Sequence, residues 1–434
     1  MNMNKLMTGA FALTVATSAT LPMATNADTI EINGVTWTYT VNNAANKTVT
    51  LGGGNTSTRA IDTTESVDAA DIPWVFTDET SGDTYKVTQV ASYAFHNCTK
   101  LTGTLTFPSS VTSIGNYAFY QCRGLTGLKL GANIKTIGSF AFAICPNMVG
   151  DISDLTSVTS FGANAFDAKD GNNHNSKLYG HVRFNPSLTS LPTTLFRYVP
   201  ITGVTLPDSL TSAASAVFQN TQIDAMWLKG SVDVDVRWFA LRAPVEIVLA
   251  GQNTRCNNPT GDSFLGEETV CKLFIPATGN WLNLVTTSSP GVDVIYYGPD
   301  RDLDISIDEA KNTLNATTTS AGMLVKMLEA APLFRSHFGL DTRISVTNAI
   351  DLTGVTITDG MLSGVTFDRL MFSVKTQSEL NAILDTFPAS TPLAIDPTGL
   401  TEDLTVAARW NVFVKSGEGY AVKKRHDGLM VIVK

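Results

Sequence analysis

The chain has 434 residues, of which 43% are hydrophobic and 16% charged, so it can form roughly two or three folded domains and is not disordered throughout. Its 39 acidic residues outnumber its 30 basic residues, and the formal net charge is -9. Binders of nucleic acid and of anionic membranes depend on clustered Lys and Arg, and the sequence contains no such cluster. We therefore expect neither nucleic acid nor a charged membrane surface as a partner.

Residues 1–27 have the features of an export signal peptide. Lys5 supplies a positive charge, residues 6–21 form a modestly apolar stretch, and small residues follow at Ala24 and Ala27. We expect cleavage after Ala27, with Ala24 as the second choice, while a buried helix is the alternative explanation. No later stretch is long and apolar enough to span a membrane. The expected location is therefore the cell surface or the extracellular space, without a membrane span after removal of the signal.

Residues 28–86 are expected to form a cap that begins with a β-hairpin. Two alternating segments, 30–32 and 35–41, flank the dipeptide Asn33-Gly34, which is a strong signal for a hairpin turn. A loop rich in Gly, Thr, Ser and Asp follows at 52–70. The next region is repetitive, and a repeat array needs a cover on its first unit.

Residues 87–297 are expected to form a solenoid because the sequence repeats. Ala-Phe pairs recur with spacings of 24, 23 and 24 residues between their phenylalanines. These are Phe95, Phe119, Phe142 and Phe166. A unit of this length cannot bury its own apolar side, so successive units must stack. Alternation with period two places one strand in each unit, with inward pairs such as Val182/Phe184, Met226/Leu228 and Ile247/Leu249.

The repeat resembles the BspA-like leucine-rich repeats of bacterial surface proteins. The resemblance rests on the stretch Ser-Ser-Val-Thr-Ser-Ile-Gly-Asn-Tyr-Ala-Phe-Tyr-Gln-Cys at 109–122 and its copies, three close and about four looser, over a little under half of the chain. It implies short parallel strands on one face, irregular turns on the other, and a role in adhesion or protein recognition. It supplies no catalytic residues.

The five cysteines fall into two groups. Cys98, Cys122 and Cys145 each follow a repeat phenylalanine by three residues. Equivalent side chains of stacked coils point in parallel, so we expect a ladder of buried free thiols rather than disulfides. Cys256 and Cys271 lie outside this ladder, and both a disulfide and two free thiols remain open for them.

Residues 298–434 lack the repeat, and we expect a separate, small α+β or mostly β domain. A capping box at Thr376–Glu379 predicts a helix that ends before Pro388. Apolar residues between 323 and 328 indicate a short helix before Pro332, and three alternating segments close the chain.

An acidic run at 300–308 allows two interpretations. Asp300, Asp302 and Asp304 resemble the start of a calcium loop, but Ile305 and Lys311 stand where such a loop needs Gly and Glu. A strand with one acidic face explains the alternating apolar residues better.

No motif for catalysis, for a cofactor or for a metal is present. The five histidines are scattered, none has the spacing of a metal site, and no glycine-rich phosphate loop occurs. We therefore expect a protein that is not an enzyme and carries no cofactor.

One set of residues indicates a binding surface. The outward position of successive strands is expected to form a column on the solvent side of the sheet. Its members are Thr106, Lys129, Ser153, Arg183, Thr205, Trp227, Val248 and Phe274. The candidate partner-binding residues are Trp227, Arg183, Val248, Phe274, His181 and Lys129. The apolar end of the column either contacts a partner or is covered by the C-terminal domain.

The resulting hypothesis is an exported, non-enzymatic surface protein that recognises an extracellular protein or glycan. A structural spacer of the cell envelope is the alternative, and an enzyme housed in residues 298–434 is the third possibility.

Overall fold

The computed structural model describes residues 27–432 with several gaps. The gaps are 80, 172–174, 231–232, 236–238, 241–243, 252–253, 258–270, 278–290, 353–354, 397, 399, 408–411, 417–418, 422–424 and 427–428. The expected export signal lies outside the described residues, except for Ala27. Within the described chain, no helix combines the length and the apolar character needed to cross a membrane.

The N-terminal part is the expected hairpin followed by a strand that joins the repeats. Strands β1 (Asp28–Ile32) and β2 (Val35–Asn43) pair antiparallel, and both turn residues have positive φ, 53° for Asn33 and 77° for Gly34. Strand β3 (Thr48–Leu51) connects β2 to β6 (Thr84–Val90). The remaining elements are β4 (Val67–Asp68), η1 (Ala69–Asp71) and β5 (Val75–Thr77).

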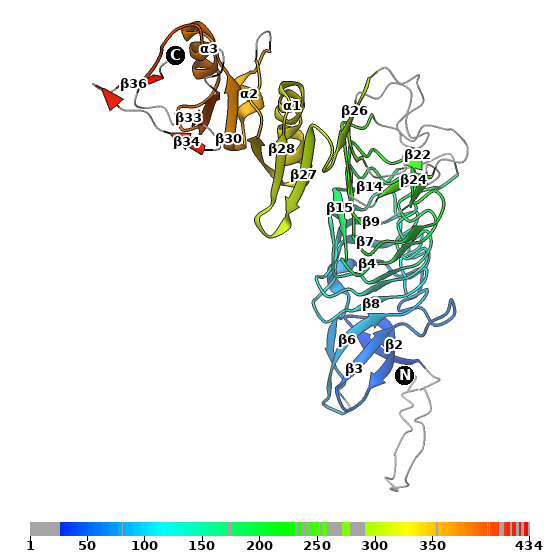
Figure 1. Ribbon diagram of the computed structural model, residues 1–434. Helices are drawn as coiled ribbons and strands as arrows, with labels where there is room; N and C mark the ends of the chain where they lie inside the picture. The colour runs from blue at the N-terminus through cyan, green and yellow to red at the C-terminus, as the bar shows by residue number, and fades with distance from the viewer. Residues whose placement is uncertain are drawn as a thin grey trace, which may run out of the picture.

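The hairpin covers the first coil of the repeats. Trp37 of β2 is 1% exposed, and its ring lies 6.5 Å from that of Phe95 in an edge-to-face arrangement. Figure 1 shows the hairpin at one end of the stacked coils. The cap therefore removes from water an apolar surface that the first coil leaves without a neighbour.

The coils stack through parallel strands on two sides. We call one side the long-strand face, which two sheets form with strand orders β14-β11-β9-β7-β4 and β12-β15-β17-β20-β23-β25-β26. Its strands are β7 (Leu101–Thr106), β9 (Leu125–Lys129), β11 (Val149–Asp151), β12 (Asp154–Leu155), β14 (Lys177–Tyr179), β15 (His181–Phe184), β17 (Gly203–Leu206), β20 (Ala225–Leu228), β23 (Ile247–Ala250), β25 (Cys271–Pro276) and β26 (Val292–Tyr297).

The other side, the short-strand face, consists of two-residue strands and continues the sheet of the cap. They are β8 (Ser113–Ile114), β10 (Thr136–Ile137), β13 (Ser160–Phe161), β16 (Ser190–Leu191) and β18 (Ser212–Ala213). Two further parallel pairs join β19 (Phe218–Gln219) to β22 (Phe239–Ala240) and β21 (Asp233–Asp235) to β24 (Arg255–Asn257).

The repeat phenylalanines form a buried, stacked ladder, which confirms the solenoid register. The ring centroids of Phe95 and Phe119 are 4.9 Å apart, and those of Phe119 and Phe142 are 5.5 Å apart. The stack continues through Phe166, Phe196 and Phe218. None of these side chains is more than 2% exposed.

The thiols of the repeat cysteines lie beside this ladder. Cys98, Cys122 and Cys145 are buried and free, as expected. The Cys122 Sγ donates to the carbonyl of Phe95 at 3.0 Å, and the Cys145 Sγ donates to that of Phe119 at 3.1 Å. Cys271 is also buried and free, whereas the side chain of Cys256 lies outside the described residues.

The C-terminal part has a seven-stranded sheet whose middle strands are parallel and alternate with helices. The sheet order is β27-β28-β29-β30-β31-β33-β34, with an antiparallel hairpin at each edge. The elements are β27 (Leu303–Asp308), η3 (Glu309–Lys311), β28 (Thr313–Thr318), α1 (Ala321–Phe338), β29 (Asp341–Val346), α2 (Asp359–Leu362), β30 (Val365–Ser373), α3 (Gln377–Thr386), β31 (Leu393–Asp396), β33 (Val412–Ser416) and β34 (Gly419–Ala421). A small antiparallel sheet joins β32 (Leu404–Ala407), β36 (Leu429–Ile432) and β35 (Arg425–His426).

This alternation is an α/β arrangement, which the sequence patterns did not predict. The capping box of α3 is present as expected, with the Thr376 hydroxyl accepting from the backbone N–H of Glu379. Helix α1, in contrast, continues through Pro332 to Phe338, so the prediction of a short helix before this proline was wrong. Its buried residues lie on both sides of the proline and include Leu324 and Phe334, so packing outweighs the local cost of the proline.

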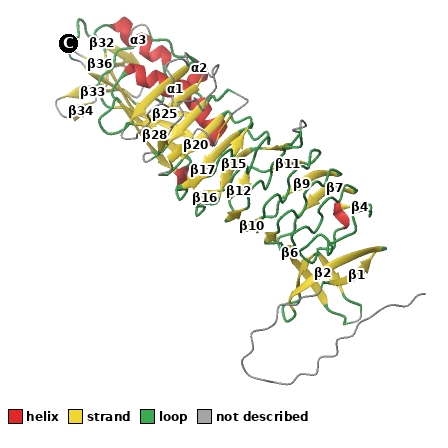
Figure 2. Ribbon diagram, turned by 90° about the vertical axis from the view of Figure 1, so that its right-hand side faces the viewer, coloured by secondary structure: helices red, strands yellow, loops and turns green. Residues whose placement is uncertain are grey.

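The C-terminal part packs on the last strands of the long-strand face. One buried cluster contains Trp227, Leu249 and Phe274 from the repeats together with Leu324 and Phe334 from α1. Figure 2 shows the strands of the long-strand face following one another toward the helices of the C-terminal part. The face is therefore covered at its C-terminal end and open at its N-terminal end.

Candidate functional site

The outward column of the long-strand face is confirmed for most of its predicted members. Parallel pairing aligns Arg183 with Thr205, Thr205 with Trp227, and Leu249 with Phe274. The residue aligned with Trp227 is Leu249, not Val248. In the coil before Arg183 the aligned residue is Asp154 rather than Ser153.

The prediction that Val248 faces outward was wrong, and so was the inward assignment of Ile247 and Leu249. Val248 aligns with Met226 and packs in the repeat core, whereas Ile247 and Leu249 belong to the cluster shared with the C-terminal part. The cause is that β23 is buried on both faces, so every residue of Ile-Val-Leu-Ala is apolar and alternation carries no information about phase.

Trp227 and Phe274 point outward, but the C-terminal part covers them. Trp227 is 8% exposed, and its ring lies 5.8 Å from that of Phe338 at the end of α1. Phe274 is fully buried, with its ring 5.1 Å from that of Phe334. Of the two explanations left open for the apolar end of the column, coverage by the C-terminal domain is therefore the one observed.

Lys129 and Arg183 remain exposed on the open part of the face. Each lies on the outward column, at the end of β9 and in the middle of β15 respectively. Among the described residues, neither side chain forms an ion pair within 4 Å. Both cations are thus available to a partner.

His181 is half-buried at the edge of the covered region. Its Nε2 lies 2.8 Å from the hydroxyl of Thr205, and its ring meets that of Phe338 edge to face at 5.7 Å. Burial, with smaller contributions from nearby His337 and Arg183, lowers the pKa of His181 to about 4. The imidazole is therefore neutral at physiological pH and can accept or donate a hydrogen bond.

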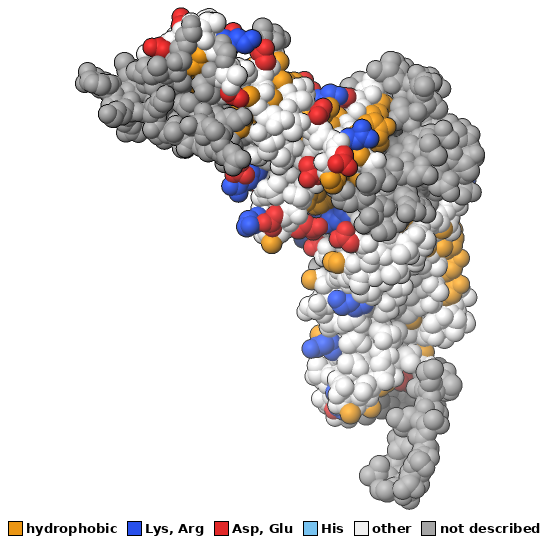
Figure 3. Space-filling model, viewed as in Figure 1, with side chains coloured by type: hydrophobic (Ala, Val, Ile, Leu, Met, Phe, Trp, Pro, Cys, Tyr) orange, Lys and Arg blue, Asp and Glu red, His pale blue; other side chains and the backbone are white. Residues whose placement is uncertain are grey.

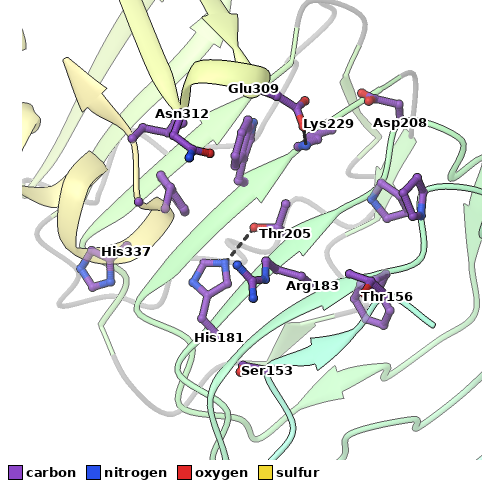
Figure 4. A pocket seen from close by; sticks show the side chains of 17 residues that line it. Ser153, Thr156, His181, Arg183, Thr205, Asp208, Lys229, Glu309, Asn312 and His337 are labelled. Carbon is purple, nitrogen blue, oxygen red and sulfur yellow. Dashed lines mark hydrogen bonds and ion pairs between the residues drawn. The ribbon is translucent and has the colours of Figure 1, made fainter. Parts of the chain in front are cut away.

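A cleft of about 500 Å³ lies where the C-terminal part meets the long-strand face; we call it the junction cleft. The repeat region contributes Ser153, Thr156, His181, Arg183, Phe184, Pro186, Thr205, Pro207, Asp208, Trp227 and Lys229, and the C-terminal part contributes Glu309, Asn312, His337, Phe338, Gly339 and Leu340. Figure 4 shows the labelled polar side chains around this space, with Asn312, Glu309 and His337 coming from the C-terminal part.

One ion pair lies in the junction cleft, and His337 links the cleft to two carboxylates outside its lining. Lys229 Nζ is 2.6 Å from Glu309 Oε2 and lies 4.2 Å from the ring centre of Trp227. His337 Nε2 is 3.1 Å from Glu246 Oε2, and its Nδ1 is 3.6 Å from Asp224 Oδ1. Burial raises the pKa of Asp224. Figure 3 shows charged side chains gathered near this junction, while the repeat surface below it is mostly uncharged.

A second hollow of about 810 Å³ continues the junction cleft along the open strands; we call it the open groove. The two spaces share Ser153 and Thr156. Gly127 keeps the floor of the open groove low, since a Cβ there would lie 2.4 Å from the Thr104 hydroxyl. Together the two spaces form a continuous depression that passes Lys129 and Arg183.

The depression is lined by hydroxyl, carboxylate, amide, imidazole and guanidinium groups. No group of three His, Cys, Asp or Glu side chains that could hold a metal occurs among the described residues. The acidic run forms strand β27, in which Leu303 and Ile305 are buried and Asp304 is exposed, as the strand interpretation predicted.

Most of the residues that line the junction cleft were not predicted from the sequence. Asp208 and Lys229 follow the ends of β17 and β20, and the strand frame could have identified both. Glu309, Asn312 and His337 carried no such signal, because nothing in the sequence indicates which surface of the C-terminal part faces the repeats.

Comparison with protein-family models matches residues 83–177 and 173–234 to the BspA type leucine rich repeat region, in six copies. Three solved structures are similar at low identity. A leucine-rich repeat protein from Bacteroides ovatus is 15% identical over 89% of this chain and 90% of its own, with a TM-score of 0.34. A leucine rich cell surface protein from Faecalibacterium prausnitzii is 15% identical over 63% and 96%, with a TM-score of 0.30. The pneumococcal vaccine antigen PcpA is 11% identical over 84% and 98%, with a TM-score of 0.32. A search of curated proteins found no match.

Proposed function

We propose that this chain, in which residues 83–234 match the BspA type leucine rich repeat region, is an exported bacterial surface protein that recognises an extracellular protein or glycan and catalyses no reaction. Residues 28–86, 87–297 and 298–434 then act as cap, recognition solenoid and C-terminal domain. The location at the cell surface is supported by the features of an export signal in residues 1–27, above all the apolar stretch at 6–21.

The observation that carries this proposal is the unequal coverage of the long-strand face. The C-terminal part buries Leu249 and Phe274, whereas Lys129 and Arg183 stay exposed beside a continuous depression. A spacer needs no such depression, because its function depends only on length. Arg is enriched among residues that dominate binding energy at interfaces, which makes Arg183 the first candidate contact.

The test is a binding panel with one double variant on the open face and one control variant on the opposite face. The chain from residue 28 is immobilised and exposed to purified extracellular-matrix proteins and to glycans. For any partner found, the double variant Lys129→Ala/Arg183→Ala should weaken binding at least about tenfold. Lys135→Ala, at an exposed lysine that directly precedes β10 on the short-strand face, should leave binding unchanged.

A panel without any partner would favour the spacer. A partner whose binding survives the double variant but is lost with Lys135→Ala would place recognition on the opposite side. Export is tested separately by fusing residues 1–27 to a reporter enzyme that is active only outside the cytoplasm.

A further inference from the structure

The depression is elongated, which indicates an elongated ligand. The open groove and the junction cleft share Ser153 and Thr156. On its other side, the junction cleft shares Trp227 and Lys229 with a third hollow of about 550 Å³ beside β27. A compact ligand would need only one of these spaces, whereas a chain molecule can occupy them in sequence.

The charges that line the junction cleft balance one another. Lys229 is paired with Glu309 at 2.6 Å, and exposed Arg183 is offset by exposed Asp208. The open groove is lined by one cation, Lys129, and by the carboxylates of Asp151 and Asp154. A polyanion or a polycation would meet about as much repulsion as attraction along this path, so the lining favours an uncharged ligand.

The shape of the depression also disfavours an extended peptide as its ligand. Most of the depression lies on the face of a sheet, where the strand peptide groups bond to neighbouring strands. The end strands that it contains, β12 and β14, have only two and three residues, which is too short an edge for an added strand. Its large apolar members are mostly covered, with Phe184 at 4% and Trp227 at 8% exposure, and cannot provide deep pockets for peptide side chains.

The exposed polar groups instead suit adjacent hydroxyl groups. The side chains of Arg183, Asp208 and Asn312 are planar, and each can make two hydrogen bonds side by side. Thr126, Ser153 and Thr156 add hydroxyls along the path. The half-buried ring of Phe338 adds an apolar contact for the C–H groups of a sugar ring.

We propose that the depression from the open groove through the junction cleft binds an uncharged oligosaccharide chain, and that the C-terminal part contributes directly to the site through Asn312. This inference rests on the proposed recognition function and narrows it to one class of ligand. It also assigns a role to the docking of the C-terminal part, which provides one wall of the cleft.

The experiment is a titration of the chain from residue 28 with neutral and acidic oligosaccharides of several sugar units, at low and high salt. We expect binding of a neutral oligosaccharide with an affinity that changes little with salt. Arg183→Ala, Asp208→Ala and Thr205→Val should each weaken it about tenfold. Thr211→Val, which removes an exposed hydroxyl on the short-strand side, should not.

Three results would overturn this inference. Salt-sensitive binding of acidic oligosaccharides alone would show that the ligand class is wrong. Neutral binding that all three cleft variants leave intact would show that the site is wrong. Binding of a panel protein that depends on Lys129 and Arg183, without binding of any oligosaccharide, would refute the glycan ligand and leave the recognition function standing. Arg183 and Asp208 lie on the surface, and Thr205→Val keeps a β-branched side chain, so all three variants should fold. A thermal melt of each variant verifies this.

Discussion

Two neighbouring phenylalanines differ in what they contribute to stability. Phe142 is 2% exposed and stacks between Phe119 and Phe166, whereas Phe140 is half-buried and stacks on Tyr117 at the corner of the coil. Replacing Phe142 with Ala should lower the free energy of unfolding by about 3–5 kcal/mol through lost burial and a cavity. Phe140→Ala, the matched control, should cost clearly less. Chemical denaturation measures both, and equal losses would contradict the assigned register.

The repeat thiols should be inert until the chain unfolds. Burial raises the pKa of Cys98 and of Cys145 to about 12 and raises that of Cys122 well above its usual value. Because the thiolate is the reactive form, alkylation at pH 8 should leave these cysteines unmodified in the native protein. All three should react after denaturation. The experiment uses a Cys256→Ser variant, and mass spectrometry measures the alkylation of each repeat cysteine before and after denaturation. Rapid labelling of Cys122 in the native protein would refute the buried ladder.

His181 should make the protein less stable in acid. Its folded pKa of about 4 lies below the ordinary value of 6.5, so the unfolded chain binds the proton more readily. Above pH 6.5 the imidazole is neutral in both states and does not lower the free energy of unfolding. As the pH drops toward 4, protonation of the unfolded chain lowers it progressively. By pH 4.5 the loss should be about 2.5 kcal/mol.

His181→Gln is the comparison that isolates this effect, because glutamine does not titrate and can keep a hydrogen bond to Thr205. Asp224 acts in the opposite direction, since its raised pKa makes its protonation in acid favourable to folding. Denaturation curves at pH 7 and pH 4.5 should therefore show a smaller acid loss for the variant than for the natural protein. The same acid loss in both proteins would mean that His181 stays accessible to protons.

At the scale of elements, the contact of β25 with α1 should be measurable as a coupling energy. The rings of Phe274 and Phe334 are 5.1 Å apart and both are fully buried. A double-mutant cycle with Ala should give about 0.5–1.5 kcal/mol of interaction. A control cycle that pairs Phe274 with Phe119, which belongs to the other buried cluster, should be additive. Additivity in both cycles would mean that the helix does not rest on the repeats.

The elements could be predicted from sequence where the two faces of a strand differ. Val182, Arg183 and Phe184 alternate between apolar and charged, so the phase of β15 was predicted correctly. Strand β23 is apolar throughout because a second layer covers it, and its phase was therefore predicted wrongly. Helix α1 was predicted too short for a related reason, since tertiary packing keeps a helix intact across Pro332.

At the scale of the whole molecule, the repeat array could be predicted from the sequence, but the packing of the C-terminal part on the array could not. Contacts within a solenoid recur at a fixed period, so one coil predicts the next and the position of Phe119 predicts that of Phe142. The packing of Phe334 against Phe274 occurs once and leaves no period to detect. The exposed half of the candidate site, with Lys129 and Arg183, was accordingly identified from sequence, while Asn312 and the cleft itself were not.

The two ends of the repeat array are covered, whereas the middle of its long-strand face is open. Trp37 seals the first coil, and the C-terminal part seals the last strands from β20 onward. Between these two seals, β7, β9 and β15 present an open surface bordered by the junction cleft, which Thr205 of β17 lines. Recognition is therefore expected on this middle section.

Hydrogen–deuterium exchange with and without the partner selected by the binding panel tests this central claim most directly. We expect added protection on the long-strand face, in peptides covering β9, β15 and β17, and on residues 309–313, which border the junction cleft. The short-strand face, at β8, β10 and β13, should exchange as before. Protection confined to the short-strand face, with none on β15 or β17, would contradict it.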